Sequence, residues 1–442
     1  MLLLKKGNAM IRSTSGTAYF NHAESKAIGT AQIAVKAKVI DTLFDHTLSL
    51  QQHNESPIGF NKEHAPKKYT QTYYQESIIN HLKEFLLKYT VVSSLYKYLR
   101  EEKIMFVGEP RLTNINVHQH QDAIYAFEYT VAPKIAVRDW RYLPFKSPVR
   151  KKYQDIDKQA SLFIEQESTA KKEYKQHLIA PGDWVLFEVS IANEKNKPLV
   201  NDLCELLWIQ ISDEDAGEPL RALFVGHSKG DTFITNNLYL QEYFGGTINT
   251  YYTFSVSIKE VIPTAYFCLD LFKDHFKLKS IRKMHQKIVE VYSSRTDISL
   301  RRAIVEEALA LLAKTYPFDV PTPAIMRQEH IILERLHESP DYAVYKLQSD
   351  FEKSVQELAR KQLRESMLAD YFAHQENITP TIKDTCQYLN FTQRPRTKEF
   401  IYFMHPAIST NEDEEPIPHE LLQYFCRKEK TINHILYHWS KP

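Results

Sequence analysis

The distribution of glycine constrains the fold of this chain more than any other feature of its sequence. Six of the eleven glycines fall between positions 182 and 246, and none occurs from 247 to 442. Glycine in a helix interior costs about 1 kcal/mol relative to alanine, and it is frequent in turns. The pattern therefore predicts a middle region of strands and turns, followed by a long helical C-terminal half.

Three segments of the middle region have the pattern of strands. Residues 184–189 and 206–211 are nearly continuous apolar runs, as in buried strands, and residues 253–258 alternate with period two. Turn-forming residues separate them at 193–198 and 244–246. We expect a compact β-rich domain over residues 180–262.

The C-terminal half, residues 263–442, repeats apolar residues at helical spacing. Prolines divide this region into separate helices, because proline interrupts helix interiors. The two clearest predicted apolar faces are Ile281, Met284, Ile288 and Val291, and Val344, Leu347, Phe351, Val355 and Leu358.

The first 140 residues contain both strand patterns and helix patterns. Residues 32–39 place apolar side chains on one face, as a strand does, residues 77–99 have a helical pattern, and residues 125–131 alternate again. A charged, helix-prone linker spans 141–179. The predicted fold class is therefore α+β multidomain: an α/β N-terminal domain over 1–140, the linker, the β-rich middle domain and an all-α C-terminal domain.

The composition excludes several classes of protein. With 43% hydrophobic and 25% charged residues and a net charge of +1, the chain is globular and is not a wholly basic nucleic-acid binder, although a local basic patch is allowed. Its four cysteines lie far apart, which suggests neither a zinc site nor a disulfide framework. We expect no cofactor, no metal and no use of ATP, because no phosphate-binding glycine motif occurs. No signal peptide or membrane span is visible, so we expect a cytoplasmic location and no membrane partner.

Two local motifs suggest other chemistry. The sequence Gly226-His227-Ser228-Lys229-Gly230 matches the nucleophile elbow of α/β-hydrolases, which requires a strand, a sharp turn and a helix. Residues 223–225 have the pattern of a strand, but residues 231–235 have that of a second strand, so we interpret the motif as a turn between two strands. His118-Gln119-His120 lacks neighbouring ligands and is interpreted as a polar loop rather than a metal site.

The loop at 59–68 is the candidate binding site of the N-terminal region. Gly59 suits a tight loop tip, Phe60 is presented beside Asn61 and Lys62, and Lys67 and Lys68 follow Pro66. An aromatic ring beside basic groups can contact a phosphate backbone and bases. Taken alone, the loop is more readily interpreted as an ordinary turn whose Phe60 folds into a core, and the rest of the chain is needed to favour a binding site.

The order of these pieces resembles trigger factor, the ribosome-associated chaperone family, over most of the chain. Residues 59–66 resemble the family's Gly-Phe-Arg-Lys-x-x-x-Pro docking signature. Residues 99–110 and 127–133 are similar to the rest of its N-terminal domain. Residues 182–185, 225–231 and 254–259 resemble its FKBP-type domain, and residues 318–321 its C-terminal chaperone domain.

The resemblance implies a function and partners. It implies an ATP-independent chaperone whose loop docks beside the ribosomal exit tunnel, against a ribosomal protein and ribosomal RNA. Helical arms would then hold nascent or unfolded polypeptides through many weak apolar contacts. The ribosome-binding residues that it implies are Gly59, Phe60, Asn61, Lys62, Lys67 and Lys68. Weak homodimerisation stays open.

Two departures from the family pattern weaken particular sites. Asn61 stands where the family has Arg, so docking is expected to be weaker or centred on Phe60 and Lys62. The FKBP-type pocket encloses a proline in aromatic walls, and the resemblance implies that Tyr243, Phe254, Leu220 and Val189 form it. Leu220 and Val189 replace aromatic residues, so weak peptidyl-prolyl isomerase activity, or none, is expected. The alternatives are a stand-alone FKBP-type isomerase and a periplasmic helical-arm chaperone.

Overall fold

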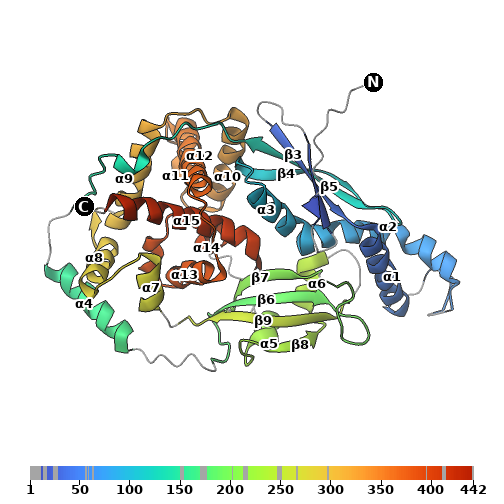
Figure 1. Cartoon of the computed structure of the whole chain (residues 1–442). Coiled ribbons are helices and arrows are strands. Elements are labelled where there is room, and N and C mark those ends of the chain that lie inside the picture. The colour runs from blue at the N-terminus through green and yellow to red at the C-terminus, as the bar shows by residue number, and fades with distance from the viewer. Residues whose placement is uncertain are drawn as a thin grey trace, which may run out of the picture.

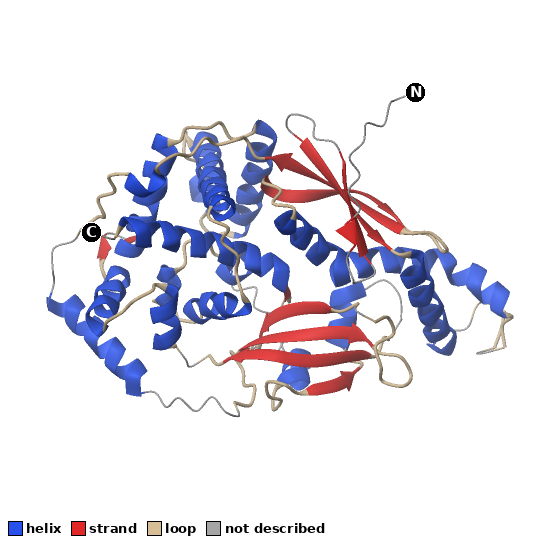
Figure 2. Ribbon diagram, viewed as in Figure 1, coloured by secondary structure: helices blue, strands red, loops and turns tan. Residues whose placement is uncertain are grey.

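The computed structural model has three regions, two built on a five-stranded sheet and one helical (Figure 1). The N-terminal sheet lies at the upper right of the view, the middle sheet at the bottom, and the C-terminal helices fill the left side. Figure 2 shows that the strands gather in these two sheets, whereas the left side is helical. The structure describes residues 11–12, 17–22, 28–54, 57, 59–61, 64–149, 154–169, 177–201, 203–212, 218–245, 251–264, 267–295, 298–394, 396–410 and 415–440.

The N-terminal region is an antiparallel sheet packed on a helical layer. The strand order is β1-β2-β3-β5-β4. The strands are β1 (Ile11–Arg12), β2 (Thr17–His22), β3 (Ile28–Val35), β4 (Phe106–Asn116) and β5 (Ala123–Val131). The helices are α1 (Ala37–Asn54), α2 (Lys67–Leu86), a π-helical turn η1 (Leu87–Val91) and α3 (Val92–Glu101). The predicted helix at 77–99 is therefore confirmed as part of a continuous helical stretch.

The predicted strand at 32–39 ends earlier than expected, and the reason is local. Strand β3 stops at Val35, and α1 begins at Ala37. The carboxylate of Asp122 accepts a hydrogen bond from the Ala37 backbone N–H at 2.9 Å and another from Lys36 Nζ at 2.9 Å. A carboxylate on free N–H groups stabilises a helix start, so it turns the chain from strand to helix here.

The middle region confirms the three predicted strands. They are β6 (Trp184–Ile191), β7 (Glu205–Gln210) and β9 (Phe254–Ile262), joined by β8 (Thr232–Thr235) and by β12 (Ile417–Pro418) from the C-terminal region, in the order β12-β7-β6-β9-β8. Helices α5 (Glu218–Phe224) and α6 (Leu238–Gly245) complete it. The expected strand at 223–225 is wrong, because Leu223 and Phe224 are buried on the last turn of α5.

Strand β6 shows why its sequence is a continuous apolar run. Phe187 and Val189 lie in the core shared with the N-terminal helices, whereas Trp184 and Leu186 lie in the core formed with the C-terminal helices. Alternate side chains of a strand point to opposite faces, so both faces of this strand are covered. The middle sheet is therefore held between the other two regions.

The C-terminal region is helical, as expected from its lack of glycine. Its elements are α7 (Leu269–His275), α8 (Ile281–Tyr292), the pair β10 (Ser294–Arg295) and β11 (Ile298–Ser299), α9 (Leu300–Thr315), α10 (Thr322–Glu338), α11 (Tyr342–Lys346), α12 (Phe351–Gln375), α13 (Ile382–Thr392), η4 (Thr397–Phe400), α14 (Pro406–Thr410) and α15 (His419–Trp439). Met284, Ile288 and Val291 are buried as predicted, but Ile281 is exposed.

The second predicted apolar face is wrong as a single buried stripe. The chain breaks between α11 and α12, so Val344 and Leu347 belong to a separate short segment, where Leu347 is 86% exposed. Val355 is buried, whereas Leu358 is exposed. Because the helical repeat extends across this break, it predicts one common face for side chains that belong to two separate helices.

The expected linker packs closely against the C-terminal helices. Its helix α4 (Gln154–Thr169) contacts α8 and α7. The short helix η2 (Trp140–Tyr142) sits against α15, where Trp439 Nε1 donates to the Trp140 carbonyl at 2.9 Å. The boundaries at 140, 179 and 262 stay a prediction. Among the helices of the described ranges, none is long and apolar enough to cross a bilayer.

Candidate functional site

The loop before α2 carries a row of exposed aromatic rings. Gly59 adopts a φ of 89°, which favours glycine over residues with a side chain. The ring of Phe60 lies 4.9 Å from that of Tyr69, which lies 6.1 Å from that of Tyr73. The three residues are 38%, 42% and 43% exposed. We call Phe60, Tyr69 and Tyr73 the aromatic tip.

The predicted docking residues gather around this tip as far as the structure describes them. Gly59, Phe60 and Asn61 are exposed, and the Asn61 carbonyl accepts a hydrogen bond from the His64 N–H at 3.1 Å. Lys68 is exposed in the first turn of α2, and Lys67 is the first residue of that helix. Lys62 lies outside the described residues. The interpretation of Phe60 as a residue that folds back into a core is not supported.

The four predicted isomerase residues converge on one core, and three of them are not accessible. Val189 on β6, Leu220 on α5 and Phe254 at the start of β9 each have an exposed fraction of 0%. Tyr243 on α6 packs against the same core, and Lys88 Nζ lies 5.1 Å from the centre of its ring. The four residues thus lie close together, with the side chains of Val189, Leu220 and Phe254 covered, and their assignment to an isomerase site stays a prediction.

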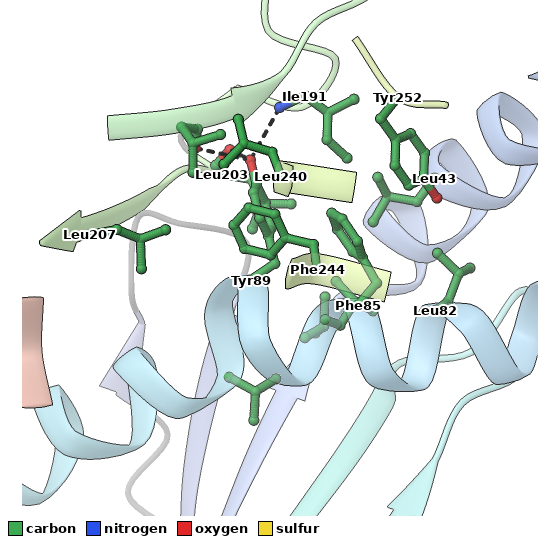
Figure 3. Close-up of a cluster of buried hydrophobic side chains, with 14 of the residues drawn as sticks. Leu43, Leu82, Phe85, Tyr89, Ile191, Leu203, Leu207, Leu240, Phe244 and Tyr252 are labelled. Atoms are coloured by element: carbon green, nitrogen blue, oxygen red, sulfur yellow. Dashed lines mark hydrogen bonds between the residues drawn. The ribbon is translucent and has the colours of Figure 1, made fainter. Parts of the chain in front are cut away.

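What covers them is the helical stretch α2–η1 of the N-terminal region. The ring of Phe85 lies 5.7 Å from Phe244 and 5.2 Å from Tyr252, and that of Tyr89 lies 5.3 Å from Phe244. Phe244 and Tyr252 in turn lie 5.8 Å and 6.1 Å from Phe254. Figure 3 shows Phe85 and Tyr89 reaching from the helix into this cluster. The aromatic walls around Phe254 are therefore filled by rings of the same chain.

The hydroxyl of Tyr89 fixes this contact with hydrogen bonds. It accepts from the Ile191 backbone N–H at 3.2 Å and donates to the Leu203 carbonyl at 2.9 Å, as the dashed lines of Figure 3 show. Burial raises the pKa of Tyr89 well above its usual value, so the hydroxyl keeps its proton. Tyr89 lies in the π-helical turn, and such turns occur frequently at functional sites of helices.

A buried relay of hydrogen bonds joins α2 to the middle region nearby. Thr47 Oγ1 donates to the Leu43 carbonyl at 2.7 Å, which leaves Thr47 to accept from Tyr252, 2.7 Å away. The Tyr252 hydroxyl then accepts from His81 Nε2 at 2.8 Å. His81 Nδ1 has no partner within the described residues, and burial lowers the pKa of His81 to about 4. His81 is therefore neutral at physiological pH.

The spacing of residues in the sequence does contain a signal for these contacts. His81, Phe85 and Tyr89 repeat every four residues, the spacing that places side chains along one face of a helix. Tyr69 and Tyr73 have the same spacing. Periodicity alone cannot say which end of the row is buried, because that depends on the partner surface.

Nothing in the described ranges supports the other chemistries. The G-x-S-x-G motif follows helix α5 and precedes strand β8, which is the reverse of a nucleophile elbow. The Ser228 hydroxyl donates to Asp231 at 3.2 Å within the turn. The expected turn between two strands is thus corrected to one between a helix and a strand. No group of three metal-ligating side chains occurs within the described ranges.

Comparisons with known proteins point to a single family. The model of the family described as "Bacterial trigger factor protein (TF)" matches residues 21–162. A trigger factor of Geotalea uraniireducens (strain Rf4) is 23% identical over 340 residues, which is 72% of this chain and 75% of the relative. A trigger factor of Geotalea daltonii is 22% identical over 351 residues, 75% of this chain and 77% of the relative.

One solved structure was also matched. It is described as "Promiscuous Substrate Recognition in Folding and Assembly Activities of the Trigger Factor Chaperone", and it aligns with 94% of this chain and 98% of its own at 18% identity and a TM-score of 0.35. The family match and the two relatives support the predicted function of a ribosome-associated chaperone. The resemblance to trigger factor that the sequence predicts is therefore confirmed, through the N-terminal family match and through relatives that cover about three quarters of the chain.

Proposed function

We propose that this chain is an ATP-independent chaperone that docks on the ribosome beside the exit tunnel and holds nascent polypeptides. The observation that carries the proposal is the family match over residues 21–162, which includes the aromatic tip. Three exposed rings beside Lys68 can stack on bases or contact a protein surface, while the lysine approaches phosphate. We propose a ribosomal protein and ribosomal RNA as the partners of this tip.

The exposed apolar side chains of α10 and of the α11 segment that follows it form our candidate surface for the nascent chain. Met326 is 64% exposed, and Val344 and Leu347 also project large apolar side chains into solvent. Burying each such side chain contributes about 1.5 to 3 kcal/mol, so a few contacts hold an unfolded segment and still release it. No nucleotide hydrolysis is needed for release from such weak sites.

Co-sedimentation with ribosomes tests the docking assignment. We expect the parent to sediment with ribosomes, and the double variant Phe60→Ala, Lys62→Ala to lose about tenfold or more in affinity. A matched control is Tyr142→Ala, Lys195→Ala, which removes an exposed aromatic ring and an exposed lysine elsewhere. Equal sedimentation of both double variants would reject the loop as the docking site.

We further propose that the middle region has no isomerase activity while α2–η1 covers it. Twisting of the prolyl bond requires a proline inside the aromatic pocket, and the space beside Phe254 is occupied by Phe244 and Tyr252. In a protease-coupled assay the full chain should match the uncatalysed rate. A rate clearly above it, with the parent folded by circular dichroism, would contradict closure of the pocket.

A Phe85→Ala variant asks whether a working pocket survives beneath the cover. If the variant remains folded and gains isomerase activity, the four residues Val189, Leu220, Tyr243 and Phe254 retain their catalytic capacity. If it remains folded and inactive, replacement of the aromatic floor and wall by Leu220 and Val189 has removed the activity itself.

A further inference from the structure

A large basic cavity lies inside the C-terminal helical region, far from the docking loop. Its volume is about 780 Å³, and its walls come from α7, α8, α9, α13 and α15. In Figure 1, α8 lies to the left of this group, and α7 and α13 lie below α15. Eight lysine and arginine side chains line the cavity, against three carboxylates. Neither the docking loop nor the candidate apolar surface for the nascent chain uses these residues.

The three carboxylates of the lining are already neutralised by lysines of the same lining. Lys383 Nζ lies 2.6 Å from Asp274, and Lys287 Nζ lies 2.7 Å from Glu290. Lys430 Nζ lies 2.9 Å from Asp384. Of the other five basic side chains, Lys273 pairs with Asp270 and Arg301 with Glu429, which leaves Lys277, Lys279 and Lys283 without an ion pair among the described residues.

The uncompensated charge is concentrated at the start of α8. Lys279 precedes the N-cap Ser280 of α8, and Lys283 lies in the first turn of the helix. Lys279 and Lys283 form no ion pair with a carboxylate of the described residues, and the first turn of α8 contains no acidic residue. Positive charges are unfavourable at a helix N-terminus, where the helix dipole is itself positive. An anion would relieve both effects at this position.

Arg301 supplies an independent sign of an incomplete site. Its side chain is 1% exposed and lines the cavity, and its carboxylate partner is Glu429, 3.4 Å away on α15. Its Nε has no hydrogen-bond partner within the described residues. A buried guanidinium donor without an acceptor is costly, but Nε exposes no surface to the cavity, so a shift of the side chain is needed to bring it to an entering acceptor.

The remaining polar groups of the wall are occupied with one another. His275 Nε2 lies 2.8 Å from Asn433 Nδ2, and its Nδ1 lies 3.4 Å from Gln387 Oε1. Burial lowers the pKa of His275 to about 4, so it is neutral at physiological pH. His275, Asn433 and Gln387 are thus engaged with one another, whereas Lys279 and Lys283 have no ion pair among the described residues. The cavity is suited to recognise charge density rather than a hydrogen-bonding pattern.

We infer that this cavity binds a chain of phosphate groups, of the kind found in inorganic polyphosphate and in nucleoside triphosphates. Lysines act on phosphate as mobile point charges, which fits a flexible anion of high charge. The site lies on the C-terminal helices and would act without the docking loop. It would therefore give the chain a response to phosphate-rich ligands that is separate from docking.

Isothermal titration calorimetry of the full chain with tripolyphosphate tests this inference. We expect saturable binding that weakens with added salt, because surface and cavity lysines carry it. The double variant Lys279→Gln, Lys283→Gln should bind at least tenfold more weakly. The control Lys195→Gln, Lys197→Gln removes the same charge from an exposed turn of the middle region and should bind as the parent does. Circular dichroism establishes that both variants are folded.

Further ligands distinguish the sources of the phosphate chain. ATP that binds as tightly as tripolyphosphate, or more weakly, assigns the site to free polyphosphate. ATP that binds at least tenfold more tightly assigns it to a nucleotide. Equal affinities of the cavity variant and the control variant would overturn the inference, as would absence of saturable binding to the parent. Tighter binding of a deca-glutamate peptide than of every phosphate ligand would also overturn it and would indicate an acidic peptide site.

Discussion

The two ends of one helical stretch use aromatic residues in opposite ways. At the start of α2, Tyr69 and Tyr73 are exposed beside Phe60. Near its end, Phe85 and Tyr89 have no exposed surface and fill the middle region. The row 69, 73, 77, 81, 85, 89 has a constant spacing of four, yet it passes from solvent to core.

Helix geometry explains the change along this row. A step of four residues exceeds one turn of 3.6 residues, so each step rotates the side chain by about 40° around the axis. Tyr69 and Phe85, four steps apart, consequently point to nearly opposite sides. The comparison teaches that one helix can present a binding tip and a buried contact without any change in its sequence pattern.

The largest expected effect comes from truncating the buried end. Phe85→Ala leaves a cavity among Tyr89, Phe244 and Tyr252 and should reduce the free energy of unfolding by about 3 to 5 kcal/mol. Tyr73→Ala on the same helix should change it by less than about 0.5 kcal/mol. Urea unfolding measures both. Similar losses for the two variants would remove the distinction between the ends.

Acid should weaken the buried end through His81. Its pKa is about 4 in the fold and 6.5 as the ordinary value, so the unfolded chain binds the proton first as pH falls. The stabilisation is complete above pH 6.5 and is lost progressively down to pH 4, by about 3 kcal/mol at most. The parent should therefore lose more stability between pH 7 and 4 than His81→Phe, in which this group cannot titrate. Parallel pH profiles of the two proteins would contradict a buried neutral His81.

A smaller effect should follow from removing one hydroxyl. Tyr89→Phe leaves the Ile191 N–H and the Leu203 carbonyl without their partner and should cost about 1 to 3 kcal/mol, with little change in packing. The control is Tyr73→Phe, whose hydroxyl lies on the exposed part of α2. Hydrogen exchange at the Ile191 amide gives a second readout, since it should accelerate only in Tyr89→Phe.

Much of the fold followed from the sequence, because local signals and burial agreed there. The glycine-rich middle and the glycine-free C-terminal half are observed as sheet and helices, and β5 alternates in burial as its residues predict. The predictions that are wrong concern places where a tertiary contact determines the local structure. Asp122 ends β3 early from 85 residues away, and the break before α12 exposes Leu347.

The candidate sites can be divided in the same way, into features set by local sequence and features set by tertiary contacts. Gly59, Phe60 and Asn61 are exposed, and an exposed loop is a local feature that the sequence can indicate, while their role in docking stays a prediction. The packing of α2–η1 over the core of Val189, Leu220 and Phe254 could not be predicted, because this helical stretch lies about 100 or more residues earlier in the chain. The spacing of these residues indicates their places along the helix, but only its packing shows which surface each one meets.

The smallest expected change in stability comes from the exposed tip. Phe60→Ala removes one tilted ring contact to Tyr69, and an aromatic pair contributes about 0.5 to 1.5 kcal/mol when it is buried. Because both rings face solvent, we expect a loss below about 0.5 kcal/mol in urea unfolding, together with weaker sedimentation with ribosomes. Tyr69→Ala should behave alike, since it removes the other half of the pair. A loss of several kcal/mol would mean that the tip belongs to a core, in which case its rings stabilise the fold and are not available to a partner.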